Sequence, residues 1–318
     1  MSNTEPPSSN PSPSGLPSGG SSSNPADASG HATQQGAAPG ADPQYNAGQT
    51  ASSRPEDHAE DETTRILTGW WHDFRIAVGF LTILPLAPSA NLDDHRTGLR
   101  FGARAFPLAG LVVGLFGALI YAIANMLRLP PEAAAFIAIG AMTVFTGALH
   151  EDGLADMADG AMARQAMSER LAVMRDSRIG TFGTLALIIV VGIKTGTITA
   201  IGWPDQVAPM LIGCAAASRA VLPAMLRFMQ PARGDGLAFR VGRPEENQVI
   251  LSALLGAAFA LLFLGPFAGL VAIIAGTCAA ALVGWIANKR LGGVTGDVLG
   301  AAQQATETTM MLAVVAMS

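Results

Sequence analysis

Long apolar stretches separated by short polar loops fill the chain from about residue 105 to its end. About 20 helical residues cross the hydrocarbon core of a bilayer, and most of these stretches approach that length. A backbone in lipid has to satisfy its hydrogen bonds within its own segment, which favours helices. The sequence therefore predicts an all-α polytopic membrane protein with the lipid bilayer as its surroundings.

We expect six to seven transmembrane helices. The clearest candidates are residues 105–127, 133–149, 184–203, 207–229, 249–264 and 267–287. A seventh stretch ends at Ser318, and it is weaker because Gln303, Gln304 and Glu307 interrupt it. Near the start, residues 74–90 form a short apolar patch broken by two prolines, so we expect a re-entrant or interfacial helix there.

The first 64 residues have a different composition. They are rich in Ser, Pro, Gly and Ala and show no apolar periodicity, which is typical of disordered segments. They also lack the basic start and apolar region of a signal peptide. We therefore expect a disordered tail, residues 1–64, followed by a membrane-embedded domain, residues 65–318. The net charge of −5 arises in this acidic tail and gives no indication of a nucleic-acid partner.

Basic residues are distributed unevenly between the two sets of loops. One set receives twelve Arg and Lys residues, whereas the other receives only Arg128. The positive-inside rule assigns the basic set to the cytoplasm. We therefore expect the loops of residues 150–183, 230–248 and 288–297 to face the cytoplasm.

The loop after the second apolar stretch begins with an unusual concentration of acids, HEDGLADMADG, from His150 to Gly160. On a helix, Asp152, Asp156 and Asp159 are spaced i, i+4 and i+7 and share one face. Their repulsion calls for a cation, and carboxylate oxygens favour magnesium, manganese or calcium over zinc. Helix capping is the alternative, although one or two acids suffice for it.

Two further segments on the same side are candidates for phosphate recognition. Arg175 and Arg178 belong to the run MRDSRIG, and the guanidinium fork matches phosphate oxygens. They are equally consistent with ordinary cytoplasmic charges. Asp176 between them is a further candidate metal ligand. The run GGVTGD ends at Asp297, another candidate ligand, and it can offer backbone N–H groups to a phosphate or form a plain turn.

Two cations lie within apolar stretches, Lys194 and Arg219. Charges inside a membrane face the bundle interior and need a counter-ion. The central part of neither stretch contains an acid. We therefore expect a substrate phosphate, or the acidic loop dipping inward, to balance them; a backbone carbonyl is the alternative partner for Lys194.

The run GALHEDGLADMADG (147–160), followed by RLAVMRDSRIGTFGTLAL (170–187), resembles the cobalamin synthase family, the adenosylcobinamide-GDP ribazoletransferases. The shorter runs FLTILPL, FPLAGLVVG, PARGDGL and GGVTGD are similar to that family in the same order, and the resemblance covers residues 70–318. It implies a magnesium-dependent enzyme of the bacterial inner membrane. Such an enzyme joins adenosylcobinamide-GDP to α-ribazole, or to its 5′-phosphate, and releases GMP in the last step of cobalamin nucleotide-loop assembly.

The resemblance also suggests roles for the residues of the acidic run. Asp152, Asp156 and Asp159 would hold Mg²⁺, and Glu151, about 100° away around the helix, would be a ligand or the general base. The arginines would contact the phosphates. Two alternatives are another membrane phosphotransferase, such as a CDP-alcohol phosphotransferase, and a secondary transporter. The first expects Ala-Arg shortly after Asp-Gly and a later Asp-x-x-x-Asp, and it fits poorly because Gly153 is followed by Leu154-Ala155-Asp156. The second expects paired inverted repeats, and no such repeat is visible in the sequence.

Overall fold

The computed structural model describes residues 69–86, 102–164 and 166–318. Within these ranges the chain is helical and contains no strand, apart from one isolated bridge between Pro231 and Val294. The prediction of an all-α membrane protein is confirmed. The predicted tail, residues 1–64, and the end of the 74–90 patch lie outside the described residues.

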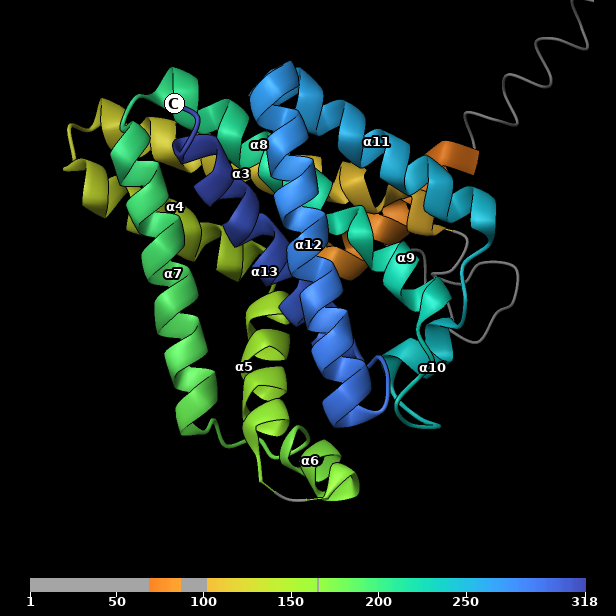
Figure 1. Ribbon diagram of the computed structural model, residues 1–318. Helices are drawn as coiled ribbons and strands as arrows, with labels where there is room; N and C mark the ends of the chain where they lie inside the picture. Colours follow the sequence, from red (N-terminus) through yellow and green to blue (C-terminus); the bar gives the residue numbers. More distant parts are fainter. Residues whose placement is uncertain (1–68, 87–101, 165) are drawn as a thin grey trace, which may run out of the picture. The chain divides into compact units, whose positions relative to one another are not determined.

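Five helices of the described chain are long and apolar enough to cross a membrane. They correspond closely to the predicted stretches (Figure 1). They are α3 (Phe106–Met126), α7 (Thr181–Ile201), α8 (Pro204–Arg219) continued by α9 (Val221–Phe228), α11 (Glu246–Leu264) and α12 (Pro266–Leu291). Two shorter helices, α6 (Met167–Val173) and α10 (Leu237–Val241), lie in the connecting segments.

The stretch predicted as the second span, residues 133–149, is bent. Helix α4 (Pro131–Phe145) ends early, and α5 (Leu149–Met162) leaves it at 91°. The bend lies at Gly147 and Ala148, which have φ values of 62° and 55°. Helix α4 alone is about 22 Å long, too short for a bilayer core. If α4 and α5 count as one broken span, the number of candidate spans is six. In either case the acidic run of residues 150–160 lies on helix α5 and not in a loop.

The predicted last span is α13 (Gly296–Val315), which is a core helix. It contacts α12, α5, α8 and α7 (Figure 1). Gln303, Gln304 and Glu307, which weakened this stretch as a span, are at most 3% exposed. Their burial shows that α13 turns its polar side chains toward neighbouring helices and not toward lipid.

The N-terminal apolar patch contains a helix over residues 69–81. This helix is roughly 20 Å long, so it is too short to cross a bilayer. Its residues Ile76, Val78 and Leu81 are buried, and Asp73 accepts an ion-pair hydrogen bond from Arg104 just before α3. These contacts fit an interfacial or re-entrant helix; its depth in the membrane stays a prediction.

Small residues allow α3 and α8 to pack backbone against backbone. A Cβ atom on Gly114 would lie 2.6 Å from the Cα atom of Ile212, and one on Gly110 would collide with the backbone of Ala215. Close approach through small residues is the usual way in which membrane helices associate. This contact makes α3 and α8 one rigid pair.

We expect Gly114→Ala to destabilise the protein by about 1–3 kcal/mol, because the backbone of α8 has to move to admit the methyl group. The midpoint of thermal unfolding in detergent measures the effect. Gly140→Ala on α4 is the matched control, since no atom of the described residues lies within 4 Å of the added Cβ. Equal midpoints for the two variants would contradict the proposed α3–α8 contact.

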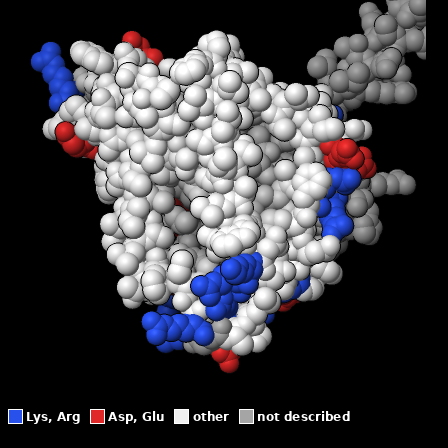
Figure 2. Space-filling model, viewed as in Figure 1, with Lys and Arg blue, Asp and Glu red and all other residues white. Residues whose placement is uncertain are grey.

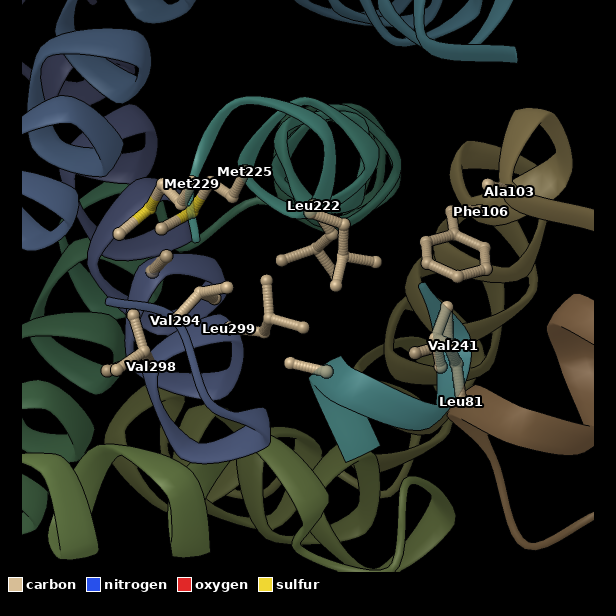
Figure 3. Packing of buried hydrophobic residues seen from close by; sticks show 14 of the residues in the cluster. Leu81, Ala103, Phe106, Leu222, Met225, Met229, Val241, Val294, Val298 and Leu299 are labelled. Atoms are coloured by element: carbon tan, nitrogen blue, oxygen red, sulfur yellow. The ribbon is translucent and has the colours of Figure 1, made fainter. Parts of the chain in front are cut away.

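A hydrophobic cluster fixes the loops at one end of the bundle. It joins the helix of residues 69–81, the start of α3, α9, α10, the end of α12 and the start of α13. In Figure 3, Leu81 and Phe106 lie near Val241, and Met229 faces Val294. The segments that leave α9 and α12 are therefore held against a packed core.

Charge is unevenly distributed over the surface. Figure 2 shows a broad uncharged area over α7, α11 and α12, with basic side chains gathered below the end of α12 and around α6. The last turn of α12 contains Lys289 and Arg290. An uncharged belt with a basic end is the pattern of a membrane protein.

Candidate metal and phosphate site

The start of α5 packs directly on the start of α13. A Cβ atom on Gly153 would lie 2.9 Å from the carbonyl oxygen of Asp297 and 3.2 Å from the Cα atom of Gly300. Only glycines permit this approach. It brings Asp152 and Asp156, which we call the acidic face of α5, beside Asp297 in the first turn of α13.

The pKa values of Asp156 and Asp297 are raised, which indicates that too few positive charges lie near these carboxyl groups to balance them. Burial, together with the charges of Asp152, Asp297 and Asp159, raises the pKa of Asp156 to about 6. Burial also raises the pKa of Asp297, although Arg233 opposes the shift. Carboxylates that destabilise one another in this way are stabilised by a cation between them.

The acidic face fits a metal ion that is shared with a ligand. In the described residues, no three His, Cys, Asp or Glu side chains converge closely enough to form a complete metal site. Magnesium is commonly held by only one or two carboxylates together with substrate phosphates. The donor set of Asp152, Asp156 and Asp297 therefore suits Mg²⁺ bound with a phosphate, rather than a site made entirely by the protein.

The segments PARGDGL and GGVTGD form one unit. The backbone N–H of Ala232 donates to Val294 at 3.0 Å, and that of Val294 donates to the carbonyl of Gln230 at 2.8 Å. Gly293 has a φ of 154°, and a Cβ atom there would collide with the carbonyl oxygen of Gln230. This pairing fixes the two loops together.

The paired loops place Arg233 in the site. Its Nη2 atom lies 3.0 Å from Oδ2 of Asp297, which also accepts a hydrogen bond from Thr295 at 3.1 Å. We did not predict Arg233 as a site residue. The signal available was its position in PARGDGL, one of the runs that carry the family resemblance.

Asp159 has a different role from the one predicted. Its Oδ2 accepts from the N–H of Gly180 at 2.7 Å, and its Oδ1 accepts from that of Gly183 at 2.9 Å. These N–H groups are the unpaired donors at the start of α7, so Asp159 caps that helix from α5. The capping interpretation is correct for this residue, and both of its oxygens are turned toward α7.

Glu151 also turns away from the acidic face. Its Oε1 accepts from Oγ1 of Thr143 at 3.1 Å and from Nε2 of Gln304 at 2.9 Å. The predicted offset around the helix therefore directs this carboxylate into the bundle. There it is not placed to bind a metal at the acidic face or to act as a general base there.

The MRDSRIG segment makes two exposed ion pairs. Nη2 of Arg175 lies 2.6 Å from Oδ1 of Asp235, which connects this segment to the loop of Arg233. Nη2 of Arg178 lies 2.6 Å from Oδ2 of Asp176 and lowers the pKa of that carboxyl to about 2. Asp176 thus has a local arginine partner at the surface and does not join the acidic face, whereas Arg175 lies close to the site.

Lys194 and Arg219 have a counter-ion within the protein, contrary to expectation. Nζ of Lys194 lies 2.8 Å from Oε1 of Glu307, and Nη1 of Arg219 lies 3.0 Å from its Oε2. All three side chains are at most 4% exposed. The adjoining cavity has a volume of about 10 Å³, enough for one water molecule and too small for a phosphate. The prediction that these cations bind substrate phosphate is therefore wrong for this arrangement.

The fold and the site together define a polytopic helical membrane protein in which carboxyl groups of α5 and α13 cluster beside Arg233. The sequence profile of the cobalamin-5-phosphate synthase family matches residues 73–315, and the chain belongs to this family. It is therefore a membrane-embedded transferase of cobalamin biosynthesis. The match includes every residue of the site.

Curated relatives agree with this assignment. The chain is 40% identical over 240 residues to an adenosylcobinamide-GDP ribazoletransferase of Bradyrhizobium diazoefficiens, covering 76% of this chain and 92% of the relative. It is 42% identical over 235 residues to the protein of that name from Brucella anthropi, and 43% identical to that from Brucella canis; each match covers 72% of this chain and 90% of the relative. No solved structure matches the chain.

Proposed function

We propose that the protein joins adenosylcobinamide-GDP to α-ribazole, or to its 5′-phosphate, and that it releases GMP in a Mg²⁺-dependent reaction. The names of the relatives support these substrates. The observation that carries the proposal is the meeting of the acidic face with Asp297 and Arg233, since a diphosphate substrate requires both a metal and a cation. This reaction completes the nucleotide loop of cobalamin.

The chemistry is the displacement of GMP at phosphorus. A hydroxyl of the ribazole forms a bond to the phosphorus attached to cobinamide, the P–O bond to GMP breaks so that GMP leaves, and the hydroxyl proton passes to solvent water. Bound Mg²⁺ supplies neutralisation of the diphosphate charge. Asp152, Asp156 and Asp297 would hold the metal.

Arg233 would bind phosphate oxygens beside the metal. Its ion pair with Asp297 fixes the guanidinium before substrate arrives, and a preorganised cation stabilises developing charge without reorganisation. Arg175, tied to Asp235 in the same loop, is the second candidate for phosphate contact.

We place the protein in the bacterial inner membrane with this site on the cytoplasmic side. The support is the charge distribution: Arg175, Arg233, Lys289 and Arg290 lie in loops or helix ends on the side of the site, whereas Arg128 lies in the turn between α3 and α4. The positive-inside rule assigns the first group to the cytoplasm. Accessibility of a single cysteine introduced beside Arg178 to an impermeant thiol reagent, in right-side-out and inverted vesicles, tests this orientation.

The function is tested by incubating the purified full chain, in lipid nanodiscs, with adenosylcobinamide-GDP and α-ribazole, with and without Mg²⁺. We expect equal amounts of cobamide and GMP, formed only with Mg²⁺, and detected by liquid chromatography and mass spectrometry. GMP release without a cobamide would show hydrolysis instead of transfer. No product at all would refute the proposed reaction.

We expect Arg233→Met to lower kcat/KM about tenfold, because one charge-assisted contact to the phosphates is lost. Steady-state rates of GMP release measure the effect. Arg243→Met is the control, since Arg243 is an exposed arginine of the following segment. Equal losses in the two variants would indicate a general effect of surface charge and not a contact by Arg233.

A further inference from the structure

We propose that Gln304 is a positioning residue, which acts through Glu151 to fix how α5 presents its acidic face to the start of α13. The proposal rests on the proposed function for the meaning of that face. It assigns a role to buried polar groups that the transfer reaction itself does not use.

The amide of Gln304 connects a cation to a carboxylate. Nζ of Lys194 donates to its Oε1 at 2.8 Å, and its own Nε2 donates to Oε1 of Glu151 at 2.9 Å. The side chain is 3% exposed. An amide offers one acceptor and one donor group, so it satisfies both neighbours, whereas a carboxylate at this position would face a second carboxylate.

The cation end of this connection is firmly anchored. Lys194 on α7 and Arg219 on α8 both pair with Glu307 on α13, at 2.8 and 3.0 Å. A buried ion pair resists displacement, because any movement leaves a charge unpaired in a medium of low dielectric constant. Gln304, one turn before Glu307 on the same helix, is thus held in a fixed place.

The carboxylate end determines the rotation of α5. Glu151 lies in the first turn of α5, directly after the bend at Gly147 and Ala148, and Thr143 of α4 gives it a second hydrogen bond. Successive residues of a helix differ by about 100°, so fixing Glu151 fixes the directions of Asp152 and Asp156. Without the Gln304 contact, the Glu151 carboxylate keeps only its hydrogen bond from Thr143 to hold the first turn of α5.

An exchange of the two groups tests the proposal. Gln304→Glu places two carboxylates together, and Glu151→Gln places two amides together. The double variant again has one carboxylate and one amide, with the same total charge, and its carboxylate at position 304 faces Lys194, which contacts the Gln304 amide in the native protein. We expect each single substitution to weaken Mn²⁺ binding in the presence of GDP about 10- to 100-fold, and the double variant to recover to within about threefold of the native protein.

Two measurements are made on the full chain in nanodiscs. The first is Mn²⁺ affinity by electron paramagnetic resonance, and the second is the Mg²⁺ dependence of GMP release. A positioning role raises the Mg²⁺ concentration needed for half-maximal rate and leaves the KM for α-ribazole unchanged. Gln304→Asn, which keeps the amide but shortens it, is expected to show the same split with a thermal midpoint near that of the native protein.

The outcomes separate this inference from the proposed function. A double variant no better than Glu151→Gln would overturn the inference, because it would show that the Glu151 carboxylate itself is required. A folded Gln304→Asn variant with native metal affinity would overturn it as well. If the native protein made no cobamide, the proposed function would fail, while recovery of Mn²⁺ affinity in the double variant would still support the positioning role.

Discussion

Replacing Asp156 with Asn is expected to reduce Mg²⁺-dependent GMP release about 1000-fold, while the protein still inserts into the membrane and folds. The raised pKa of Asp156 reflects burial and the neighbouring charges of Asp152 and Asp297. The amide removes a charge that the metal needs, but it relieves repulsion in the metal-free protein. We therefore expect the thermal midpoint without metal to stay the same or to rise. Asp152→Asn should behave in the same way.

Asp159→Asn is the matched control for these two variants. It changes the same residue type on the same helix, but Asp159 caps α7 through Gly180 and Gly183. The amide of Asn accepts only one of these two hydrogen bonds, so we expect a loss of stability of about 1 kcal/mol, while the activity of the folded protein stays within about threefold of the native value. A loss as large as that of Asp156→Asn would restore Asp159 to the metal site. Full activity of Asp156→Asn or Asp152→Asn would refute the metal assignment for that residue.

Replacing Glu307 with Ala is expected to destabilise the protein by about 3–5 kcal/mol, because Lys194 and Arg219 are left buried without a counter-ion. The pairs that are lost measure 2.8 and 3.0 Å, and Gln303 also donates a hydrogen bond to Oε2 of Glu307. Chemical unfolding in detergent micelles measures the free-energy difference. Activity per folded molecule should also fall, because Glu307 anchors Lys194, whose hydrogen bond holds Gln304 in place.

Glu246→Gln provides the comparison for the effect of a glutamate charge. Glu246 is 71% exposed and lies 3.6 Å from Arg227. Exposed ion pairs contribute about 0–1 kcal/mol, so little change in stability is expected. A Glu307→Ala variant as stable as Glu246→Gln would show that the two buried cations have another partner, such as a bound anion.

Local properties of the sequence were sufficient to predict much of the fold. Apolar length located the spans, and helical spacing placed Asp152 and Asp156 on one face of α5. The bend at Gly147 and Ala148 was not predicted, since the apolar run continues through it without a proline. Hydropathy measures how apolar a segment is, but it does not show where the helix axis changes direction.

The errors in the predicted site have a common cause. The partner of a polar side chain depends on the tertiary structure, and sequence spacing does not reveal it. Glu307 looked like a defect in a span, because its cations are 88 and 113 residues away in the chain. The clue was present in Gln303, Gln304 and Glu307, which share one side of an apolar helix. Asp159 finds its partners 21 and 24 residues away, and no spacing rule indicates that contact.

The central claim is that the acidic face of α5 and Asp297 hold a metal ion together with the substrate diphosphate. The most direct test is a cryo-electron-microscopy structure of the full chain in nanodiscs with Mg²⁺ and a non-hydrolysable analogue of adenosylcobinamide-GDP. We predict a metal ion in contact with Asp152, Asp156 or Asp297 and with the diphosphate, and we predict Arg233 in contact with a phosphate oxygen. A diphosphate bound at Lys194 and Arg219, or a metal held by Asp159 and Asp176, would contradict this account.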